Sequence, residues 1–169
     1  VYMSPYQYDK YINARKEERK LEKKQKNTGL FGNQVSVYKT YSRNICNFVF
    51  PENINRPKPK DIKDLKNNEK KEEYTKQVND ALGKLTNANL STELKIYSPK
   101  FNKIIENVSK SEGNVLIYSQ FSTVEGIEIL SRSLDLVGYG EFKIVYKNGE
   151  WDIQYDSSKP AYTKFKSDD

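Results

Sequence analysis

The stretch that decides the fold is GNVLIYSQFSTVEGIEIL, residues 113–130, in which an apolar run gives way to polar residues and then to a new apolar period. Residues 115–117, Val-Leu-Ile, form a continuous apolar run, which is typical of a parallel strand buried on both faces. Ser122 and Glu125 have the spacing of a capping box, which indicates the start of a helix. The stretch therefore predicts a strand, a polar turn and a helix.

The flanking sequence extends this pattern into an α/β order. Ser98 and Pro99 fit the N-cap and first position of a helix with the apolar face Phe101, Ile104, Ile105 and Val108. The helix after the turn has the apolar face Val124, Ile127, Leu130, Leu134 and Val137, and Gly138 is expected to end it. Beyond it, FKIVYKNGEWDIQY, residues 142–155, predicts a hairpin turning at Asn148-Gly149, and residues 161–165 predict a further strand. Helix, strand, helix, strand is an α/β succession.

The first half of the chain reads as helices joined by polar linkers. Ser4, Pro5 and Gln7 predict a capped helix with an apolar stripe of Tyr8, Tyr11, Ile12 and Arg15 in its first turns. Residues 15–26 are almost all charged, which favours a solvated helix over a basic nucleic-acid arm because acidic side chains are interleaved. Residues 35–50 have Tyr38, Tyr41, Ile45 and Phe48 in helical register, ended by Pro51. Residues 51–61 are expected to be an extended linker and residues 62–85 a charged helix or variable insertion.

Composition sets limits on the chemistry. The 169 residues are 36% hydrophobic and 31% charged, with a net charge of +6, one cysteine and no histidine. A single cysteine, Cys46, excludes an internal disulfide and, without histidine, an ordinary zinc site; its apolar neighbours favour a core position. No stretch has the length of a membrane span. The charge is compatible with a phosphate-rich partner, although A·T-rich coding explains the excess lysine equally well.

The turn after residues 115–117 is the candidate site. In open α/β sheets, ligands bind beyond the carboxyl ends of the strands, where loops meet helix N-termini. Ser119, Gln120, Phe121 and Thr123 would lie at such a point, and free backbone N–H groups there can receive a phosphate. The alternative is that Ser122 only caps the helix and Phe121 only packs in the core.

Several motifs, in order along the chain, resemble superfamily 2 helicases. NVLIYSQFSTVEGIEIL looks like their motif IV, which opens the second RecA-like lobe, and YMSPYQYDKY resembles the entry to that region. SRNICNFVFP, residues 42–51, resembles an R-x-I-C-N element that precedes lobe 2 in Snf2-like ATPases, with Phe48 where histidine is frequent. Together with YSPKF and the hairpin before YTKF, the set looks most like helicases of large nucleocytoplasmic DNA viruses, related to poxvirus early-transcription and nucleoside-triphosphatase helicases.

The resemblance implies a partial RecA-like lobe 2 with parallel strands, a β-hairpin insertion and an N-terminal helical segment. It implies three parts: a helical segment joining the lobes at residues 1–50, a linker and charged insertion at residues 51–97, and the first half of lobe 2 at residues 98–169. NTGLFGNQ lacks the lysine of a phosphate-binding loop, and no acidic Mg²⁺-binding box follows a strand. We therefore expect a helicase piece without catalytic residues or bound cofactor, whose parent would use ATP and Mg²⁺.

In that parent, ATP hydrolysis would drive movement along nucleic acid, and this piece would supply DNA or RNA backbone contacts from Ser119, Gln120 and Thr123, with Phe121 and Val124 shaping the loop. Viral transcription machinery is a further implied partner, a membrane is not, and the implied location is intracellular: the host cytoplasm or the virion. Two alternatives stay open. One is a non-catalytic, helicase-derived interaction module in a viral transcription or virion complex. The other is an unrelated α/β domain.

Overall fold

The computed structural model describes residues 1–28, 41–56, 68–121 and 124–165. Their helices and strands follow one another along the chain as α1 (Pro5–Thr28), α4 (Asn68–Gly83), α5 (Asn87–Leu90), α6 (Leu94–Tyr97), α7 (Pro99–Lys110), the π-helix η1 (Val124–Glu128), α8 (Ile129–Leu136), β1 (Gly140–Glu141), β2 (Lys143–Lys147), β3 (Glu150–Gln154) and β4 (Ala161–Tyr162). The fold is thus mixed helix and sheet.

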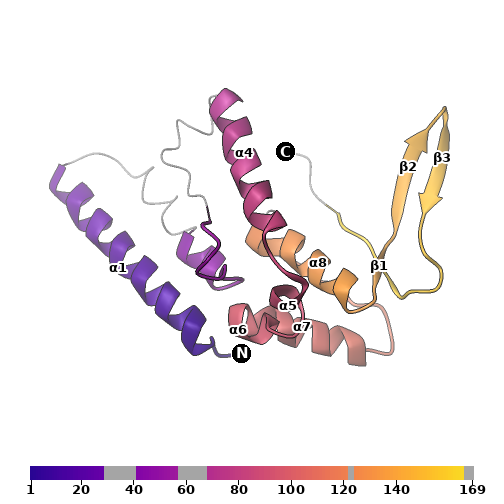
Figure 1. Ribbon diagram of the computed structural model, residues 1–169, viewed down its shortest axis with the longest axis horizontal. Coiled ribbons are helices and arrows are strands. Elements are labelled where there is room, and N and C mark those ends of the chain that lie inside the picture. The colour runs from indigo at the N-terminus through magenta and orange to yellow at the C-terminus, as the bar shows by residue number, and fades with distance from the viewer. Residues whose placement is uncertain (29–40, 57–67, 122–123, 166–169) are drawn as a thin grey trace.

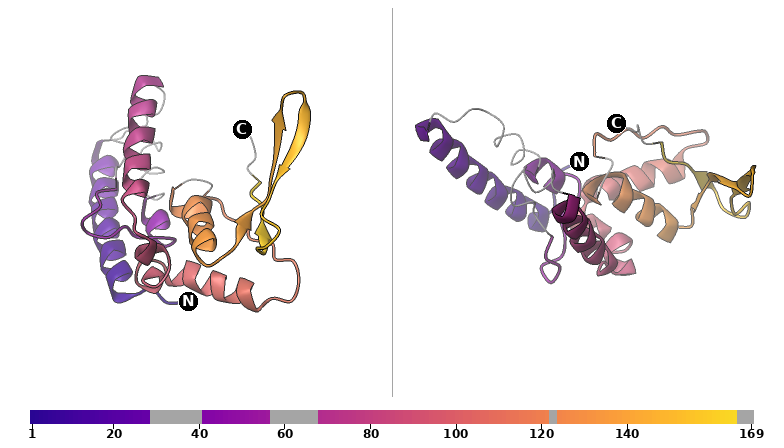
Figure 2. Two further views of the ribbon diagram at one scale, coloured as in Figure 1. Left: turned by 45° about the vertical axis from the view of Figure 1, so that its right-hand side comes forward. Right: turned by 90° about the horizontal axis from the view of Figure 1, so that it is seen from above.

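The helices form the body of the molecule, and the β2–β3 hairpin projects away from it in every view (Figures 1 and 2). One apolar core joins residues 48–54 to the helices α4 to α8. Its buried members are Phe48, Phe50, Ile54, Val78, Ala81, Leu82, Leu90, Leu94, Phe101, Val124, Ile129, Leu130 and Leu134. The region around the candidate loop therefore rests on side chains from both halves of the sequence.

Helix α1 begins as predicted, and its buried face overlaps the predicted stripe in part. The backbone N–H of Gln7 donates to Ser4 Oγ at 3.0 Å, which confirms the N-cap. The amide of Gln7 does not return to the cap; its Nε2 donates to the Ile45 carbonyl at 2.7 Å. Tyr11 of the predicted stripe packs against the buried cluster of Ala14, Ile45 and Val49, whereas Tyr8 is exposed and Gln7, which was not in the stripe, is buried.

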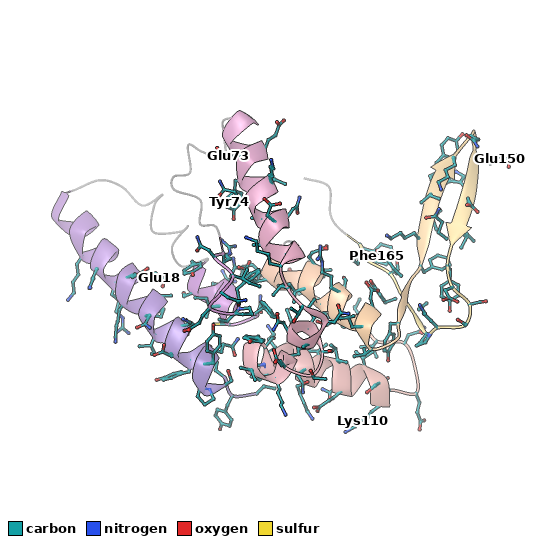
Figure 3. All side chains as sticks on the ribbon, in the orientation of Figure 1. Glu18, Glu73, Tyr74, Lys110, Glu150 and Phe165 are labelled. Carbon is teal, nitrogen blue, oxygen red and sulfur yellow. The ribbon has the colours of Figure 1, made fainter. Side chains whose placement is uncertain are left out.

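The charged half of α1 is also less solvated than predicted. Glu18 is buried, and its carboxylate accepts hydrogen bonds from Arg15 Nη1 at 2.5 Å and from the Ser42 backbone N–H at 3.2 Å. Buried carboxylates persist when such donors compensate for lost water. Figure 3 shows Glu18 on the side of α1 that faces the short helical segment at residues 41–45. This contact joins α1 to residues 41–45.

The helix predicted over residues 35–50 is shorter in its described part. Only residues 41–45 are helical, and Phe48, Val49 and Phe50 continue as non-helical chain before Pro51. The Val49 backbone N–H donates to the Tyr97 carbonyl at 3.0 Å, a bond that replaces the helical one. Tyr38 and the proline-rich linker at residues 57–61 lie outside the described residues.

The predicted start of α7 and end of α8 are confirmed. Ser98 Oγ accepts from the Phe101 N–H at 3.0 Å, with Pro99 at the first helical position. After α8, Gly138 has φ +98°, and the N–H of Tyr139 donates to the Leu134 carbonyl at 3.0 Å. This is a Schellman ending, in which glycine takes the left-handed position. Ser122 lies outside the described residues, and the Glu125 carboxylate binds Arg56 instead of capping η1.

Both predicted β features after α8 form. Strands β2 and β3 pair antiparallel across Asn148 (φ 51°) and Gly149 (φ 89°), the two positive φ values of a type I′ turn. Strands β1 and β4 pair in parallel, with Gly140 opposite Ala161. The sheet is therefore a small parallel pair beside a hairpin.

The strand predicted at residues 115–117 was wrong. Val115 is exposed, Leu116 is 94% exposed and Ile117 is half-buried, and none of them lies in a strand. A parallel strand needs a neighbour to take up its backbone hydrogen bonds. In the part of the chain that is described, β1 pairs only with β4 and β2 only with β3, so no partner strand reaches this segment.

Candidate nucleic-acid interface

The predicted loop opens onto a pocket that separate parts of the chain build together. The pocket has a volume of about 360 Å³ and is lined by Arg43, Cys46 and Asn47, by the first turns of α7, by residues 117–121, and by Gly126, Ile127 and Leu130. We call it the loop pocket. Among the described residues, its lining includes two cations, Arg43 and Lys100, and no carboxylate. A positively charged lining of this kind favours an anionic ligand.

The floor of the loop pocket is apolar because α7 and α8 turn their hydrophobic faces toward each other. Phe101 and Leu130 are buried in the core, and Ile104, Ile117 and Ile127 line the same pocket. Pro99 and Ser98 fix where α7 starts, and this sets the position of Lys100 one residue into the helix. The result is an apolar base with polar and cationic groups around it.

The loop itself is held by its own hydrogen bonds. Ser119 Oγ accepts from the Phe121 N–H at 3.1 Å and donates to the Phe121 carbonyl at 3.2 Å. That carbonyl also accepts from the Ile127 N–H at 3.0 Å. The Ser119 hydroxyl therefore shapes the turn, and its contacts go to the loop rather than outward.

Close packing behind the loop requires a glycine. A Cβ placed at Gly126 would lie 1.7 Å from the Phe121 carbonyl oxygen, far inside van der Waals contact. Any side chain there would push the loop away from η1. The backbone of η1 is kinked at Gly126, whose φ of -112° and ψ of -121° are not helical, so the loop and α8 meet at this glycine.

Arg43 reaches the loop from 77 residues away in the sequence. Its Nη2 donates to Gln120 Oε1 at 2.5 Å, and its guanidinium carbon lies 5.3 Å from the centroid of the Phe121 ring. The second contact is a cation–π arrangement. Arg43 is exposed, so the cation stays available at the surface while these contacts orient it. It belongs to the R-x-I-C-N element, which offered a signal for the site without indicating this contact.

Lys100 supplies the second cation. Its Nζ donates to Asn47 Oδ1 at 2.8 Å, which uses one of three ammonium donors. The Asn47 carbonyl accepts from the Ser98 hydroxyl, and Asn47 Nδ2 is buried without a hydrogen-bond partner. Asn47 thus anchors both the cap of α7 and the ammonium of Lys100. The sequence analysis did not predict Arg43, Asn47 or Lys100 as site residues, because they approach the loop only through contacts between distant parts of the chain.

Of the predicted site residues, the structure brings Ser119, Gln120 and Phe121 together around the loop pocket. Thr123 lies outside the described residues. Val124 is buried in the core behind the loop, in keeping with a role in shaping it. The structure thus describes three of the four predicted residues and adds Arg43 and Lys100.

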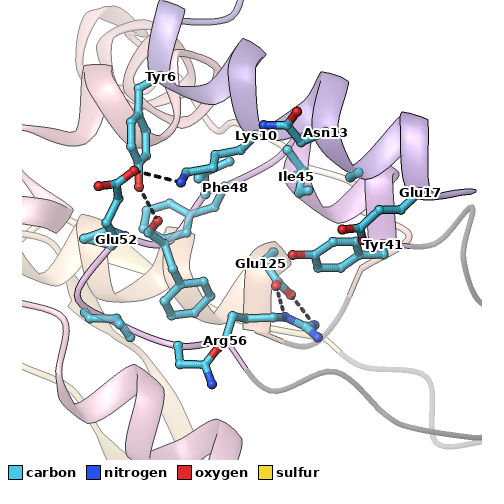
Figure 4. Close-up of a pocket in the computed structure, with 16 residues that line it drawn as sticks. Tyr6, Lys10, Asn13, Glu17, Tyr41, Ile45, Phe48, Glu52, Arg56 and Glu125 are labelled. Atoms are coloured by element: carbon cyan, nitrogen blue, oxygen red, sulfur yellow. Dashed lines mark hydrogen bonds and ion pairs between the residues drawn. The ribbon is translucent and has the colours of Figure 1, made fainter.

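A second cavity, of about 480 Å³, lies on the other side of this region between α1 and residues 41–56 (Figure 4). Arg56 crosses its lining to pair with both oxygens of Glu125, and Lys10 Nζ contacts Glu52 at 2.9 Å. Glu17 also lines the cavity, so its carboxylates outnumber its cations. The balance makes it a poorer phosphate site than the loop pocket.

The pair with Glu125 stabilises the charged form of Arg56. Burial disfavours the guanidinium, but the hydrogen bonds and charge of Glu125 outweigh it and raise the pKa of Arg56. Because Glu125 belongs to η1, the pair ties residues 51–56 to the segment that backs the loop.

Cys46 also lines the loop pocket. Its thiol donates to the Ser42 carbonyl at 3.2 Å, and burial raises its pKa. A raised pKa keeps the thiol protonated, so it is a poor nucleophile. Among the described residues, no group of acidic, cysteine or histidine side chains is arranged to hold a metal ion. The helices described also include none long and apolar enough to cross a membrane.

Comparison with known proteins gives one match. No family profile and no solved structure matches the chain. The chain is 25% identical over 209 aligned positions to a protein of Acanthamoeba polyphaga mimivirus named "Putative ATP-dependent RNA helicase". The similarity is to a viral helicase. The alignment covers 84% of this chain and 25% of the mimivirus protein, so the chain spans about a quarter of that relative's length.

Proposed function

We propose that this chain is a nucleic-acid-binding piece of a viral superfamily 2 helicase, contributing backbone contacts from part of a RecA-like lobe 2. The observation that carries the proposal is the loop pocket, where Arg43 and Lys100 flank the loop and no carboxylate lines the pocket in the part of the chain that the structure describes. The similarity to a mimivirus helicase supports the same class. The three-part organisation at residues 1–50, 51–97 and 98–169 belongs to this proposal.

The proposed contacts are electrostatic and independent of sequence. Arg43 offers a planar guanidinium fixed by Gln120 and Phe121, and Lys100 offers a point charge fixed by Asn47. Both recognise phosphate oxygens, which position a strand but carry no base information. In the parent helicase, ATP and Mg²⁺ would act in the cleft between lobes, and lobe closure would move this surface along the strand. By itself, the chain should neither bind nor hydrolyse ATP, which calorimetric titration checks.

The test is salt-dependent binding of a labelled single strand, measured by fluorescence anisotropy with DNA and RNA oligonucleotides. Each phosphate contact adds about 0.7 to the slope of log affinity against log salt for single strands. Replacing both cations (Arg43→Gln with Lys100→Gln) should therefore reduce the slope by about 1.4. The matched control is Lys16→Gln with Lys20→Gln on α1, which removes the same charge from exposed positions. Equal losses in the two double variants would refute the pocket as the binding surface.

A second candidate, a helicase-derived interaction module without motor function, draws support from the hairpin. Ile144, Tyr146, Trp151 and Ile153 pair across β2 and β3 on one face, and all are exposed. Exposed apolar faces of this kind mark protein contacts. If single-strand binding is absent while an intact hairpin is needed for assembly with a viral partner, this alternative holds.

A further inference from the structure

Tyr118 lines the loop pocket, and its side chain is largely exposed. Its side chain is 83% exposed, and it lies directly before Ser119 among the residues that line the pocket. A ring that remains this exposed contributes little buried area to the fold. Single exposed aromatics are common, so the position alone indicates nothing. Its surroundings decide what it can do.

Those surroundings suit an unpaired base. The apolar floor of the pocket, formed by side chains such as Phe101, Ile104 and Leu130, matches the face of a nucleobase. The volume of about 360 Å³ falls in the range of small-ligand pockets. Gln120 and Asn47 place amide groups at the lining, and Arg43 and Lys100 place cations beside it. The pocket thus offers apolar surface, polar edges and positive charge at one place.

We propose that the loop pocket receives one unpaired base of the bound strand, with Tyr118 stacked on the base and Arg43 and Lys100 on the adjacent phosphates. This inference rests on the proposed function and deepens it. It adds a base contact to a surface otherwise expected to touch only the backbone. Stacking tolerates any base because every base has a π-face, so binding stays independent of sequence but requires a single strand.

The exposed aromatic surface of the hairpin fits a nucleic acid less well. On the hairpin, Tyr146 and Trp151 already pack against each other, with ring centroids 5.0 Å apart. The hairpin carries Lys143 and Lys147 on β2 and Glu150 and Asp152 on β3, so its charges balance and its two carboxylates repel phosphate. The described lining of the loop pocket, by contrast, has two cations and no carboxylate. Charge therefore selects Tyr118 as the stacking residue.

The test compares the wild-type chain with Tyr118→Ala and Tyr118→Phe by fluorescence anisotropy, using a labelled oligothymidine and a strand of equal length made of abasic sites. Loss of one stacking contact lowers affinity by about 5- to 150-fold. We expect that loss for Tyr118→Ala on oligothymidine, wild-type affinity for Tyr118→Phe, and unchanged salt slopes. The matched control is Tyr8→Ala, an exposed tyrosine on α1. Thermal melts confirm that each variant is folded.

The abasic strand separates the two proposals. Wild-type protein should bind it about as weakly as Tyr118→Ala binds oligothymidine, while keeping the same salt slope. If the wild type binds both strands equally, or if Tyr118→Ala loses nothing, the base contact is refuted and the backbone surface stands. If the wild type binds neither strand, the proposed function fails and the base contact fails with it.

Discussion

The ion pair between Arg56 and Glu125 offers a test of how the two halves of the chain are joined. The pair is bidentate, with Arg56 Nη2 2.9 Å from Glu125 Oε2 and Nε bonded to Oε1. The side chains are 12% and 4% exposed. Removing one partner leaves the other as an uncompensated buried charge. The perturbations are Arg56→Met, Glu125→Leu and the two together.

The surroundings set the size of each effect. Arg56→Met leaves the Glu125 carboxylate, the more buried of the two groups, without its partner. We therefore expect a loss of about 3–5 kcal/mol in the free energy of unfolding. Glu125→Leu should lose about 3 kcal/mol or less. The loss is smaller because the Arg56 side chain keeps other surroundings in this variant. It lines the 480 Å³ cavity, its guanidinium lies 5.8 Å from the centroid of the Tyr41 ring, and its Nη1 lies 3.4 Å from Tyr74 Oη. The double variant removes both charges, so it should lie within about 1 kcal/mol of wild type.

Urea unfolding followed by circular dichroism measures all four proteins. Losses for independent sites add within about 0.5 kcal/mol, whereas this pair should show a coupling of at least about 2 kcal/mol. Lys103→Ala provides the control, because its pair with Glu106 is about half exposed on both sides (48% and 45%) and should contribute at most about 1 kcal/mol. Additive losses in the double variant would refute the argument that this pair is buried and coupled.

Two further outcomes follow from titratable groups. Because burial raises the pKa of Cys46, its thiol should react with a disulfide reagent at about pH 8 more slowly in the folded than in the urea-unfolded chain. A single strand bound in the loop pocket should slow the reaction further, because Cys46 lines that pocket. Equal rates in the folded chain with and without the strand would show that the strand binds elsewhere. Burial disfavours the Glu141 carboxylate, but hydrogen bonds from Lys143 and Lys164 outweigh it and lower its pKa. Its stabilising contribution is therefore present above the unfolded pKa of about 4.3 and is lost as pH falls through the lower folded pKa. Melting temperatures of wild type and Glu141→Gln at about pH 7 and pH 3 should converge at the acidic value, and a constant difference would contradict the assignment.

Features fixed by neighbouring residues could be predicted from the sequence. Ser98 and Pro99 start α7, Gly138 ends α8, and Asn148-Gly149 turns the hairpin. Each depends on φ preferences and hydrogen bonds within a few residues, so the local sequence contains the whole cause. The same reasoning identified Ser119, Gln120 and Phe121 as one polar loop.

Features that need a partner from far along the chain could not be predicted. The sequence predicts Glu18 to be solvated, but in the structure its carboxylate accepts a hydrogen bond from the Ser42 backbone. The sequence likewise predicts that Glu125 caps a helix, but its carboxylate pairs with Arg56. Arg43 meets the loop only because the core brings residues 41–50 against α7 and α8.

Residues 115–117 were predicted to form a strand that the structure does not contain, again because a distant partner decides the outcome. Its apolar sequence is that of a buried strand, yet a strand exists only when another chain segment accepts its hydrogen bonds. The described sheets contain no neighbour for it, and Leu116 stays in solvent. The sequence by itself determined the caps, turns and apolar faces, since these arise between adjacent residues. Only the tertiary structure decided which charges are buried, which strand pairs and which cations surround the loop, because those depend on contacts between distant residues.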